Sequence, residues 1–391
     1  MSKKALPRIP HLPSLSITGF RGIDHVTIPR LGSVTLLAGK NGIGKTTILD
    51  AVRVYASRGL PSVLQSLLSV REEFATTLDE EHDTRPFPDY VSLFHGRDIA
   101  QLTPISIGPV DPHDQLVIAT SCSAGWPDEQ QELFDETFSD FLGEADVKAI
   151  KLTFRKQERL LAWFVSDGGR YVFNEAGLPG EFKRRLSGFR KRERSFDFPT
   201  IDCESLGPGL PNNTTLARFW DSVALTEQEQ LTIDALRLVL GDSIDRIAIV
   251  GDDSQRFRPG RRRAVVKLTD HPSPVPLKSL GDGAIRMFAL GLAIANCRDG
   301  FLLVDEAENG IHYTVQQNIW NMIFNSTRDN NVQVLATTHS DDCVKGFARA
   351  AVQHELEGVL VRIERHGDGM RSIEYNEDDL WTIAEQGIEV R

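Results

Sequence analysis

Short apolar runs bounded by glycine alternate with stretches of helical spacing along much of the chain. Two apolar runs occupy residues 12–23 and 32–39, and a stretch with helical spacing follows at 46–56. Runs of this length fit β-strands, whereas apolar residues that recur every three to four positions fit an amphipathic helix. Residues 32–56 are therefore expected to form a strand, a glycine loop and a helix in succession.

The pattern changes after residue 105, where several short segments resemble the strands of an antiparallel lobe. An acidic stretch with helical spacing, residues 126–142, interrupts them, and residues 199–213 are predicted to form a Pro/Gly/Asn-rich loop. Strong periodicity then predicts helix across 214–240. The remaining expected elements are a hairpin at 244–269, a helix at 283–297, a strand at 301–304, a strand at 331–340, a helix at 340–351, a hairpin at 359–376 and a terminal helix at 376–391.

The composition of the 391-residue chain is ordinary for a soluble globular protein, with 40% hydrophobic and 25% charged residues. The longest apolar runs are far too short to cross a membrane, and the N-terminus lacks the apolar core of a signal peptide. Four unclustered cysteines form neither a disulfide framework nor a zinc pattern, which favours a reducing cytoplasm. A net charge of −11 argues against a dedicated nucleic-acid coat protein but is compatible with a local basic patch.

A glycine-rich stretch between the first predicted strand–helix pair matches the pattern G-x-x-x-x-G-K-T. Glycines let the backbone wrap around a phosphate chain, and the following helix presents its positive N-terminal end. Lys45 is expected to reach the β- and γ-phosphates of ATP, and the Thr46 hydroxyl to bind Mg²⁺. The nucleotide-binding residues predicted here are Gly39, Lys40, Asn41, Gly42, Ile43, Gly44, Lys45, Thr46 and Thr47.

A second stretch, FLLVDEAENGIHYT at residues 301–314, places acids directly after a buried strand. Asp305 at the strand end is expected to complete the magnesium site, and Glu306 to polarise the attacking water as a general base. The distance of 260 residues between Lys45 and Asp305 (305 − 45) fits an ATPase whose two halves are separated by a large insertion.

The same stretch has two other interpretations, an ordinary strand followed by an acidic loop and a small zinc site. A zinc site needs three or four converging ligands. Glu308 and His312 would face each other only on a helix, which Asn309 and Gly310 disfavour.

Two further motifs point to a family. Residues 279–295 resemble the signature segment of ATP-binding-cassette-type ATPases, and residues 335–340 resemble their switch-histidine segment. Together with GFRG at 19–22 and the two motifs above, they follow the order of SMC/RecF-like ATPases. The closest resemblance is to the overcoming-lysogenization-defect (OLD) group, labelled AAA_15 or AAA_21, over roughly residues 12–110 and 214–391.

This resemblance implies an α/β fold of the ABC/SMC-head kind, a P-loop ATPase with a mixed central sheet, an antiparallel β lobe and an inserted helical region. It divides the chain into one half of the head at 1–110, an inserted lobe at 111–213 and the other half of the head at 214–391. It also implies that two heads pack face to face around two ATP molecules. The residues implied to act on the nucleotide of their own subunit are Arg21, Lys45, Thr46, Asp305, Glu306 and His339. The residues implied to act on the nucleotide of the partner are Ser279, Gly281, Asp282 and Gly283, while Glu308 and His312 become candidates for a dimer-facing loop.

OLD-type nucleases continue into a TOPRIM nuclease domain, whereas 52 residues follow His339 here (391 − 339). Such a domain is expected to need about a hundred residues, so a nuclease is expected in a separate chain. That arrangement is similar to the ATPase subunit of two-component anti-phage systems such as PARIS. The expected partners are a second copy of the chain, an effector nuclease and a phage protein that acts as trigger.

Two basic clusters could bind nucleic acid or an acidic viral protein. They could equally be solvated faces balanced by the acidic stretch at 127–145, or interfaces between subunits, and the negative net charge favours these alternatives. The first cluster comprises Lys183, Arg184, Arg185, Arg190, Lys191, Arg192 and Arg194, and the second comprises Arg258, Arg261, Arg262 and Arg263.

The sequence thus predicts a cytoplasmic ATPase that uses ATP and Mg²⁺ to sense infection and to control a separate nuclease in bacterial anti-phage defence. The alternatives are a RecF-like ATPase of DNA repair and a nucleotide-gated scaffold with little turnover. An autonomous nuclease is disfavoured, because no acid cluster remains once the ATPase residues are assigned.

Overall fold

A computed structural model describes residues 10–75, 87–97, 102–122, 146–167, 170–173, 198–251, 262–354, 358–367 and 369–386. The chain forms two compact units. The first comprises Met1–Ser14, Ile28–Leu49 and Ile201–Arg391, and the second comprises Leu15–Thr27 and Asp50–Thr200. The predicted acidic stretch at 126–142 and basic cluster at 183–194 lie outside the described residues.

The first unit is built on a six-stranded sheet in the order β11-β15-β16-β3-β17-β18. Its first five strands run parallel, and β18 pairs antiparallel with β17, so the sheet is mixed as predicted. The strands span Cys203–Leu206 (β11), Phe301–Val304 (β15), Gln333–Thr338 (β16), Val34–Ala38 (β3), Gly358–His366 (β17) and Gly369–Tyr375 (β18).

The register of the parallel strands brings three distant segments to one edge. Val304 pairs with Ala336, and Thr338 pairs with Ala38, so β15, β16 and β3 end at the same side of the sheet. The loops that follow these strands therefore meet there, as the carboxyl ends of parallel strands do in open α/β sheets.

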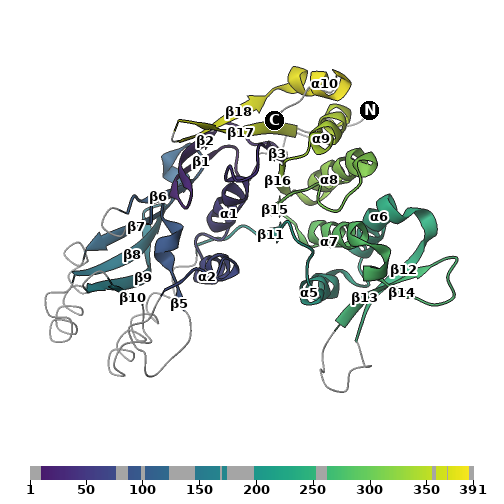
Figure 1. The fold of residues 1–391 in the computed structure, drawn as a ribbon, viewed down its shortest axis with the longest axis horizontal. Coiled ribbons are helices and arrows are strands. Elements are labelled where there is room, and N and C mark those ends of the chain that lie inside the picture. The colour runs from purple at the N-terminus through teal and green to yellow at the C-terminus, as the bar shows by residue number, and fades with distance from the viewer. Residues whose placement is uncertain are drawn as a thin grey trace. The chain divides into compact units, whose positions relative to one another are not determined.

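Helices α7, α8 and α9 lie along one side of this sheet (Figure 1). Helix α7 is apolar nearly all round and carries twelve buried residues, as expected of a helix enclosed on every side. Phe288 of α7 and Ile323 of α8 belong to one apolar core with Leu36 and Leu302 of the sheet. The helices of this unit span Asn213–Val223 (α5), Gln228–Leu240 (α6), Asp282–Asn296 (α7), Gln316–Asn330 (α8), Asp341–Gln353 (α9) and Glu377–Gln386 (α10).

The helix predicted over 214–240 is in fact two helices, because the chain turns between α5 and α6. Leu225 has φ 63°, a left-handed backbone that cannot continue an α-helix. The carboxylate of Glu229 accepts a hydrogen bond from the Leu225 amide at 2.8 Å, which compensates for a helical bond lost at the turn. Periodicity alone missed this break, since apolar residues recur at helical spacing on both sides of it.

One element contradicts the sequence prediction, and another is absent from it. Residues 203–206, predicted as part of a loop, form β11 and pair in parallel with β15. Helix α8 was not predicted, and its sequence QQNIWNMIFNSTRDN contains several residues of low helix propensity. Both elements owe their conformation to tertiary packing, because β11 extends the sheet and the core side of α8 buries Ile319, Trp320 and Phe324.

A small three-stranded sheet completes the first unit. Its strands are β12 (Ile244–Gly251), β13 (Arg262–Leu268) and β14 (Val275–Pro276), and β12 and β13 pair antiparallel as the predicted hairpin. A short 3-10 helix, Leu277–Leu280, then leads into α7.

The second unit contains a seven-stranded sheet in the order β10-β9-β8-β7-β6-β1-β2. The pairings described from β1 through β6 to β10 are antiparallel, so the predicted antiparallel lobe is confirmed. Its strands span Leu15–Phe20 (β1), Ile23–Ile28 (β2), Ile105–Gly108 (β6), Leu116–Cys122 (β7), Asp146–Phe154 (β8), Gln157–Asp167 (β9) and Arg170–Phe173 (β10). Helix α2 (Pro61–Val70) and a two-stranded sheet of β4 (Phe74–Ala75) and β5 (Phe87–Pro88) also belong to this unit.

Gln333 fixes the N-terminal segment to the first unit. Its side chain is buried, accepts a hydrogen bond from the Leu12 amide at 2.9 Å, and donates to the carbonyls of Leu12 at 2.8 Å and Gly32 at 3.1 Å. These bonds satisfy three buried backbone groups.

Replacing Gln333 with leucine is expected to lower the free energy of unfolding by about 2–4 kcal/mol, because it leaves buried backbone groups unpaired. Denaturant unfolding of Q333L measures this loss. The matched control is Gln230→Leu on the exposed surface of α6, where the loss of one side-chain bond to Asp234 is expected to cost about 0.5 kcal/mol. Equal losses in the two variants would contradict the assignment.

Candidate functional site

The glycine loop, residues 39–47, connects β3 to α1 (Lys45–Ala56). Gly42 and Gly44 have φ of 74° and 102°, a backbone that favours glycine over other residues. At Gly39 a side chain would also collide, because an added Cβ would lie 2.5 Å from the carbonyl oxygen of Ile363 in β17. The loop is therefore held against the sheet in a conformation that only glycines permit.

A hollow of about 450 Å³ borders this loop and is lined by residues 39–43 and 362–365. Lys40 lines it from the loop, and Arg362 and Arg365 line it from the end of β17. Glu364 also lines it and pairs with Arg362 at 3.3 Å, so the three basic side chains leave a net positive lining that suits an anionic ligand.

Lys45 lies at the first position of α1 and is buried. Its Nζ donates hydrogen bonds to the carbonyl oxygens of Gly39 at 2.6 Å and Lys40 at 3.0 Å, so the ammonium group points back across the loop. Burial lowers the pKa of Lys45, and the carboxylates that follow β15 oppose this shift. The lysine and the N-terminus of α1 thus converge on the space enclosed by the loop, which fits phosphate groups.

Asp305 meets Thr46 across the sheet edge. The Thr46 hydroxyl donates to Asp305 Oδ2 at 2.8 Å, and the Thr337 hydroxyl donates to Asp305 Oδ1 at 2.5 Å. A hydroxyl and a carboxylate oxygen in contact are hard donors of the kind that Mg²⁺ prefers. The donor set of Thr46 and Asp305 therefore fits a magnesium ion.

Glu306 is held in an unusual conformation beside this pair. Its backbone has φ 49°, rare for a residue with a side chain and costly unless its surroundings compensate. Its amide donates to the Thr337 hydroxyl at 2.9 Å, and its carboxylate accepts a hydrogen bond from Asn309 Nδ2 at 2.7 Å. The same Asn309 amide group donates to the Pro208 carbonyl at 3.1 Å. The carboxylate is thus oriented by a side chain that is itself fixed.

Arg286 of α7 forms hydrogen bonds with the backbone of the acidic loop, residues 305–310. It is 2% exposed and donates to the carbonyl oxygens of Asp305 at 2.6 Å and Glu306 at 3.2 Å. It also donates to the carbonyl of Gly207 at 2.5 Å in the segment after β11. Burial lowers the pKa of this guanidinium, while the carboxylates of the acidic loop oppose the shift. Arg286 therefore fixes the backbone from which the two acids project.

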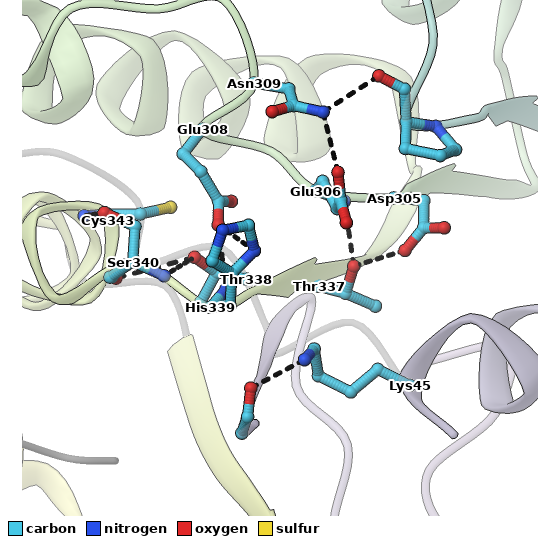
Figure 2. A network of polar contacts seen from close by, with 12 residues as sticks. Lys45, Asp305, Glu306, Glu308, Asn309, Thr337, Thr338, His339, Ser340 and Cys343 are labelled. Carbon is cyan, nitrogen blue, oxygen red and sulfur yellow. Dashed lines mark hydrogen bonds and ion pairs between the residues drawn. The ribbon is translucent and has the colours of Figure 1, made fainter. Parts of the chain in front are cut away.

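Glu308 of the acidic loop reaches His339, the residue that follows β16. Figure 2 shows its carboxylate against His339, across the edge from Lys45. Glu308 Oε1 accepts a hydrogen bond from the His339 amide at 2.8 Å and lies 3.1 Å from His339 Nδ1. His339 is thereby fixed between the end of β16 and the Ser340 cap of α9.

The signature residues lie at the start of α7 in the same unit. Gly281 has φ 94° and precedes the helix, and Gly283 has no room for a side chain, since a Cβ would lie 2.7 Å from the Gly310 carbonyl. In the part of the chain that the structure describes, no hydrogen bond or ion pair joins Ser279, Gly281 or Asp282 to the glycine loop. Their implied action on a partner's nucleotide stays a prediction.

Arg21 belongs to the second unit, where it follows β1. Its guanidinium is buried and lies 2.9 Å from Oε2 of Glu73. The other carboxylate oxygen of Glu73, Oε1, lies 2.6 Å from the guanidinium of Arg97. Burial lowers the pKa of Arg21 and the neighbouring Arg71 lowers it further, while Glu73 opposes the shift. The structure thus gives Arg21 a partner in its own unit, and its implied contact with a nucleotide stays a prediction.

The alternative metal interpretation is not supported by the geometry of its proposed ligands. Glu308 faces His339, whereas His312 caps the short helix Tyr313–Val315 and lies 2.9 Å from the Thr314 hydroxyl. Across the described ranges, no group of three or more His, Cys, Asp or Glu residues could hold a metal ion.

Only two residues of the second basic cluster, Arg262 and Arg263, fall within the described ranges. Arg262 forms a bidentate ion pair with Asp221 at 2.6 and 2.7 Å. This pairing neutralises the charge of Arg262 within the protein, whereas the acidic stretch at 127–145 that is expected to balance the clusters lies outside the described residues.

Sequence reasoning missed four residues of this site in whole or in part. Thr337 and Asn309 had no assigned role, Glu308 was expected only in a dimer-facing loop, and Arg286 lay within the signature segment without a role of its own. The polar residues in the otherwise buried strand QVLATT were the available signal for Thr337. The other three required knowledge of which loops meet.

Two family models match the chain. The first, described as "AAA domain, putative AbiEii toxin, Type IV TA system", matches residues 228–342, and the second, described as "AAA domain", matches residues 14–78. The second includes the glycine loop and the first includes Asp305, Glu306 and His339. These matches support a P-loop ATPase.

One similar curated sequence is an uncharacterized protein of Methanocaldococcus jannaschii, 28% identical over 113 residues that cover 29% of this chain and 99% of that protein. Similar solved structures include an SMC head bound to the C-terminal winged-helix domain of ScpA, with a TM-score of 0.47, 12% identity and coverage of 96% of this chain and 100% of that one. An SMC head domain from Thermotoga maritima gives a TM-score of 0.39, 11% identity and coverage of 93% and 99%. A Pyrococcus furiosus Smc head bound to the C-terminal domain of ScpA gives a TM-score of 0.42 and 12% identity, with coverage of 97% of this chain and 99% of that one. Since all three TM-scores are below 0.5, the interpretation of the site rests on its geometry and on the family matches.

Among the described residues, no helix combines the length and the apolar character needed to cross a membrane.

Proposed function

We propose that this chain is a magnesium-dependent ATPase of the ABC/SMC-head kind. The observation that carries the proposal is the direct contact of Thr46 with Asp305 at 2.8 Å, beside Lys45 in its glycine loop. These residues stand 259 positions apart in the chain, yet they form the hydroxyl, carboxylate and ammonium set that P-loop enzymes use.

Each side chain has a distinct task in this proposal. Thr46 and Asp305 would hold Mg²⁺, which when bound neutralises charge on the phosphates. Lys45 would exchange its hydrogen bonds to two loop carbonyls for bonds to phosphate oxygens. Because its side chain is already buried, ATP binding would not have to bury it further. Glu306 would accept a proton from the attacking water, and Asn309 keeps its carboxylate oriented for that transfer.

The proposal includes a head-to-head dimer. The start of α7 supports it, because Gly281 and Asp282 are exposed and the helix N-terminus carries a partial positive charge suited to a phosphate of a second nucleotide. Head closure would then bury each nucleotide between two chains.

We further propose that the dimer regulates a separate effector, a nuclease, in bacterial defence against phage. The description of the family model matched at 228–342, which names a toxin of a type IV toxin–antitoxin system, supports a role in bacterial conflict. The basic residues that line the hollow at the glycine loop do not by themselves indicate nucleic acid, because they suit a nucleotide equally well.

Phosphate release from ATP tests the enzymatic part. The purified chain is expected to hydrolyse ATP in the presence of Mg²⁺ and to stop when EDTA removes the ion, since the Thr46 hydroxyl and the Asp305 carboxylate would then have no Mg²⁺ to bind. Hydrolysis that persists undiminished in EDTA would contradict the assigned magnesium site. Stimulation by DNA without any protein partner would instead favour a repair ATPase. Phage plating on cells that carry the native locus, with and without an intact Lys45 codon, tests the defence role.

A further inference from the structure

The acidic loop carries a third carboxylate that the proposed hydrolysis does not use. Glu308 lies three positions after Asp305, and its side chain is 11% exposed. Burying a carboxylate costs desolvation free energy unless its surroundings compensate, so the position of Glu308 at this edge calls for an explanation.

Both groups that Glu308 Oε1 approaches belong to one residue. The oxygen accepts from the His339 amide at 2.8 Å, and the ring Nδ1 lies 3.1 Å from it, although the ring is not aligned for a full hydrogen bond. The second oxygen, Oε2, is buried and has no hydrogen-bond partner within the described part of the chain. The carboxylate therefore directs its contacts to His339 (Figure 2).

The charges around Glu308 place it at the nucleotide site. Of the carboxylates that raise the pKa of Lys45 against the effect of burial, Glu308 acts most strongly. Glu308 also opposes the lowered pKa of the buried Arg286. Glu308 thus acts electrostatically on Lys45 of the glycine loop and bonds the amide of His339, the residue that follows β16.

We propose that Glu308 is a positioning residue that fixes His339 for the hydrolysis reaction. It holds the His339 backbone through a hydrogen bond from the amide and places a carboxylate oxygen 3.1 Å from Nδ1 of the ring, which leaves Nε2 as the ring nitrogen turned away from Glu308. An outer carboxylate that fixes the ring of a functional histidine is a common device in protein sites. This inference rests on the proposed function and on the implied action of His339 on the nucleotide of its own subunit, because it assigns Glu308 a part in the same site.

A purely structural alternative gives Glu308 only the task of satisfying the His339 amide at a strand end. The two roles differ in what depends on His339. A positioning residue acts through the ring of His339, so its loss lowers kcat no further once that ring is absent. Loss of a purely structural residue would lower kcat whether or not the ring is present.

The test is a double-mutant cycle with Glu308→Ala and His339→Ala, measured as kcat and KM for ATP. We expect E308A to lower kcat by roughly 10- to 100-fold with KM within a few-fold, because a misplaced group of this kind costs up to about 100-fold. H339A is expected to lower kcat similarly, and E308A combined with H339A is expected to lower it no further. Multiplicative losses in the double variant would overturn the proposal.

Two conservative variants separate position from charge and guard against a variant that fails to fold. Glu308→Gln keeps an oxygen acceptor at the same reach, so it is expected to retain kcat within a few-fold. Glu308→Asp keeps the charge but withdraws the oxygen by one methylene, so it is expected to behave like E308A. The reverse order, with E308D active and E308Q inactive, would overturn the proposal.

Hydrogen exchange supplies a readout that does not depend on activity. In nucleotide-free protein, E308A and E308D are expected to raise deuterium uptake in the peptide that spans residues 335–341, because the His339 amide loses its acceptor, while E308Q keeps the wild-type uptake. Unchanged uptake in all three variants would refute the contact itself. If the wild-type chain hydrolyses no ATP, the proposed function fails, and the exchange experiment still decides whether Glu308 holds His339.

Discussion

Replacing Lys45 with alanine is expected to weaken binding of Mg·ATP by about 10- to 100-fold. The ammonium group is the buried positive charge of the glycine loop, and a hydrogen bond to a charged group is worth about 1.5–3 kcal/mol. Titration calorimetry measures the affinity directly. Thermal unfolding reports the affinity independently, since ATP at about 100 times its dissociation constant stabilises a binding protein by about 2.7 kcal/mol. At the same ATP concentration, K45A should keep only about 0.4–1.4 kcal/mol of that stabilisation.

Lys40→Ala is the matched control. Lys40 stands in the same loop, but its side chain is exposed, and its carbonyl rather than its ammonium group bonds Lys45. K40A removes the same charge and is expected to retain binding within a few-fold. If both variants bind equally weakly, the loop attracts phosphate through its general positive charge, and Lys45 has no special role.

Replacing Glu306 with glutamine is expected to lower hydrolysis by about 10²- to 10⁴-fold while ATP still binds, because an amide cannot accept the proton of the attacking water. Glutamine retains an oxygen that can accept from Asn309, so the local structure should survive. The variant should therefore accumulate as an ATP-bound assembly. Single-turnover phosphate release measures the rate, and light scattering with and without ATP measures the size of the assembly.

The control for this variant is Glu227→Gln, the same chemical change at an exposed position before α6. It is expected to hydrolyse ATP at the wild-type rate. Wild-type turnover by E306Q would show that another group accepts the proton. If E306Q binds ATP but neither hydrolyses it nor forms a larger assembly, blocked hydrolysis does not trap closed heads, and the proposed dimer is contradicted.

The glycine loop is the part of the site that the sequence predicts in most detail. Its function depends on residues that are adjacent in the chain, and glycines at 39, 42 and 44 adopt backbone conformations that their residue type makes accessible. The strand before the loop and the helix after it follow from local apolar patterns as well. Local chemistry was therefore sufficient there.

The meeting of Thr46 with Asp305 was predictable in kind but not in detail. Both motifs signal their chemistry in the sequence, and the parallel pairing of β3, β16 and β15 brings them to one edge. The sequence could not show that Thr337 would orient Asp305 and also bind the Glu306 amide. That contact depends on the relative register of two strands, which apolar runs of similar length leave open.

By itself, the sequence determined the glycine loop, the acids after β15 and the α/β character, because short-range backbone preferences and periodic burial govern these features. The tertiary structure alone decided that residues 203–206 form a strand, that α8 is a helix, and that Glu308 faces His339 rather than His312. The physical reason is the same in each case. A weak local preference was overridden by the burial of apolar surface and by the pairing of polar groups from segments far apart in the chain.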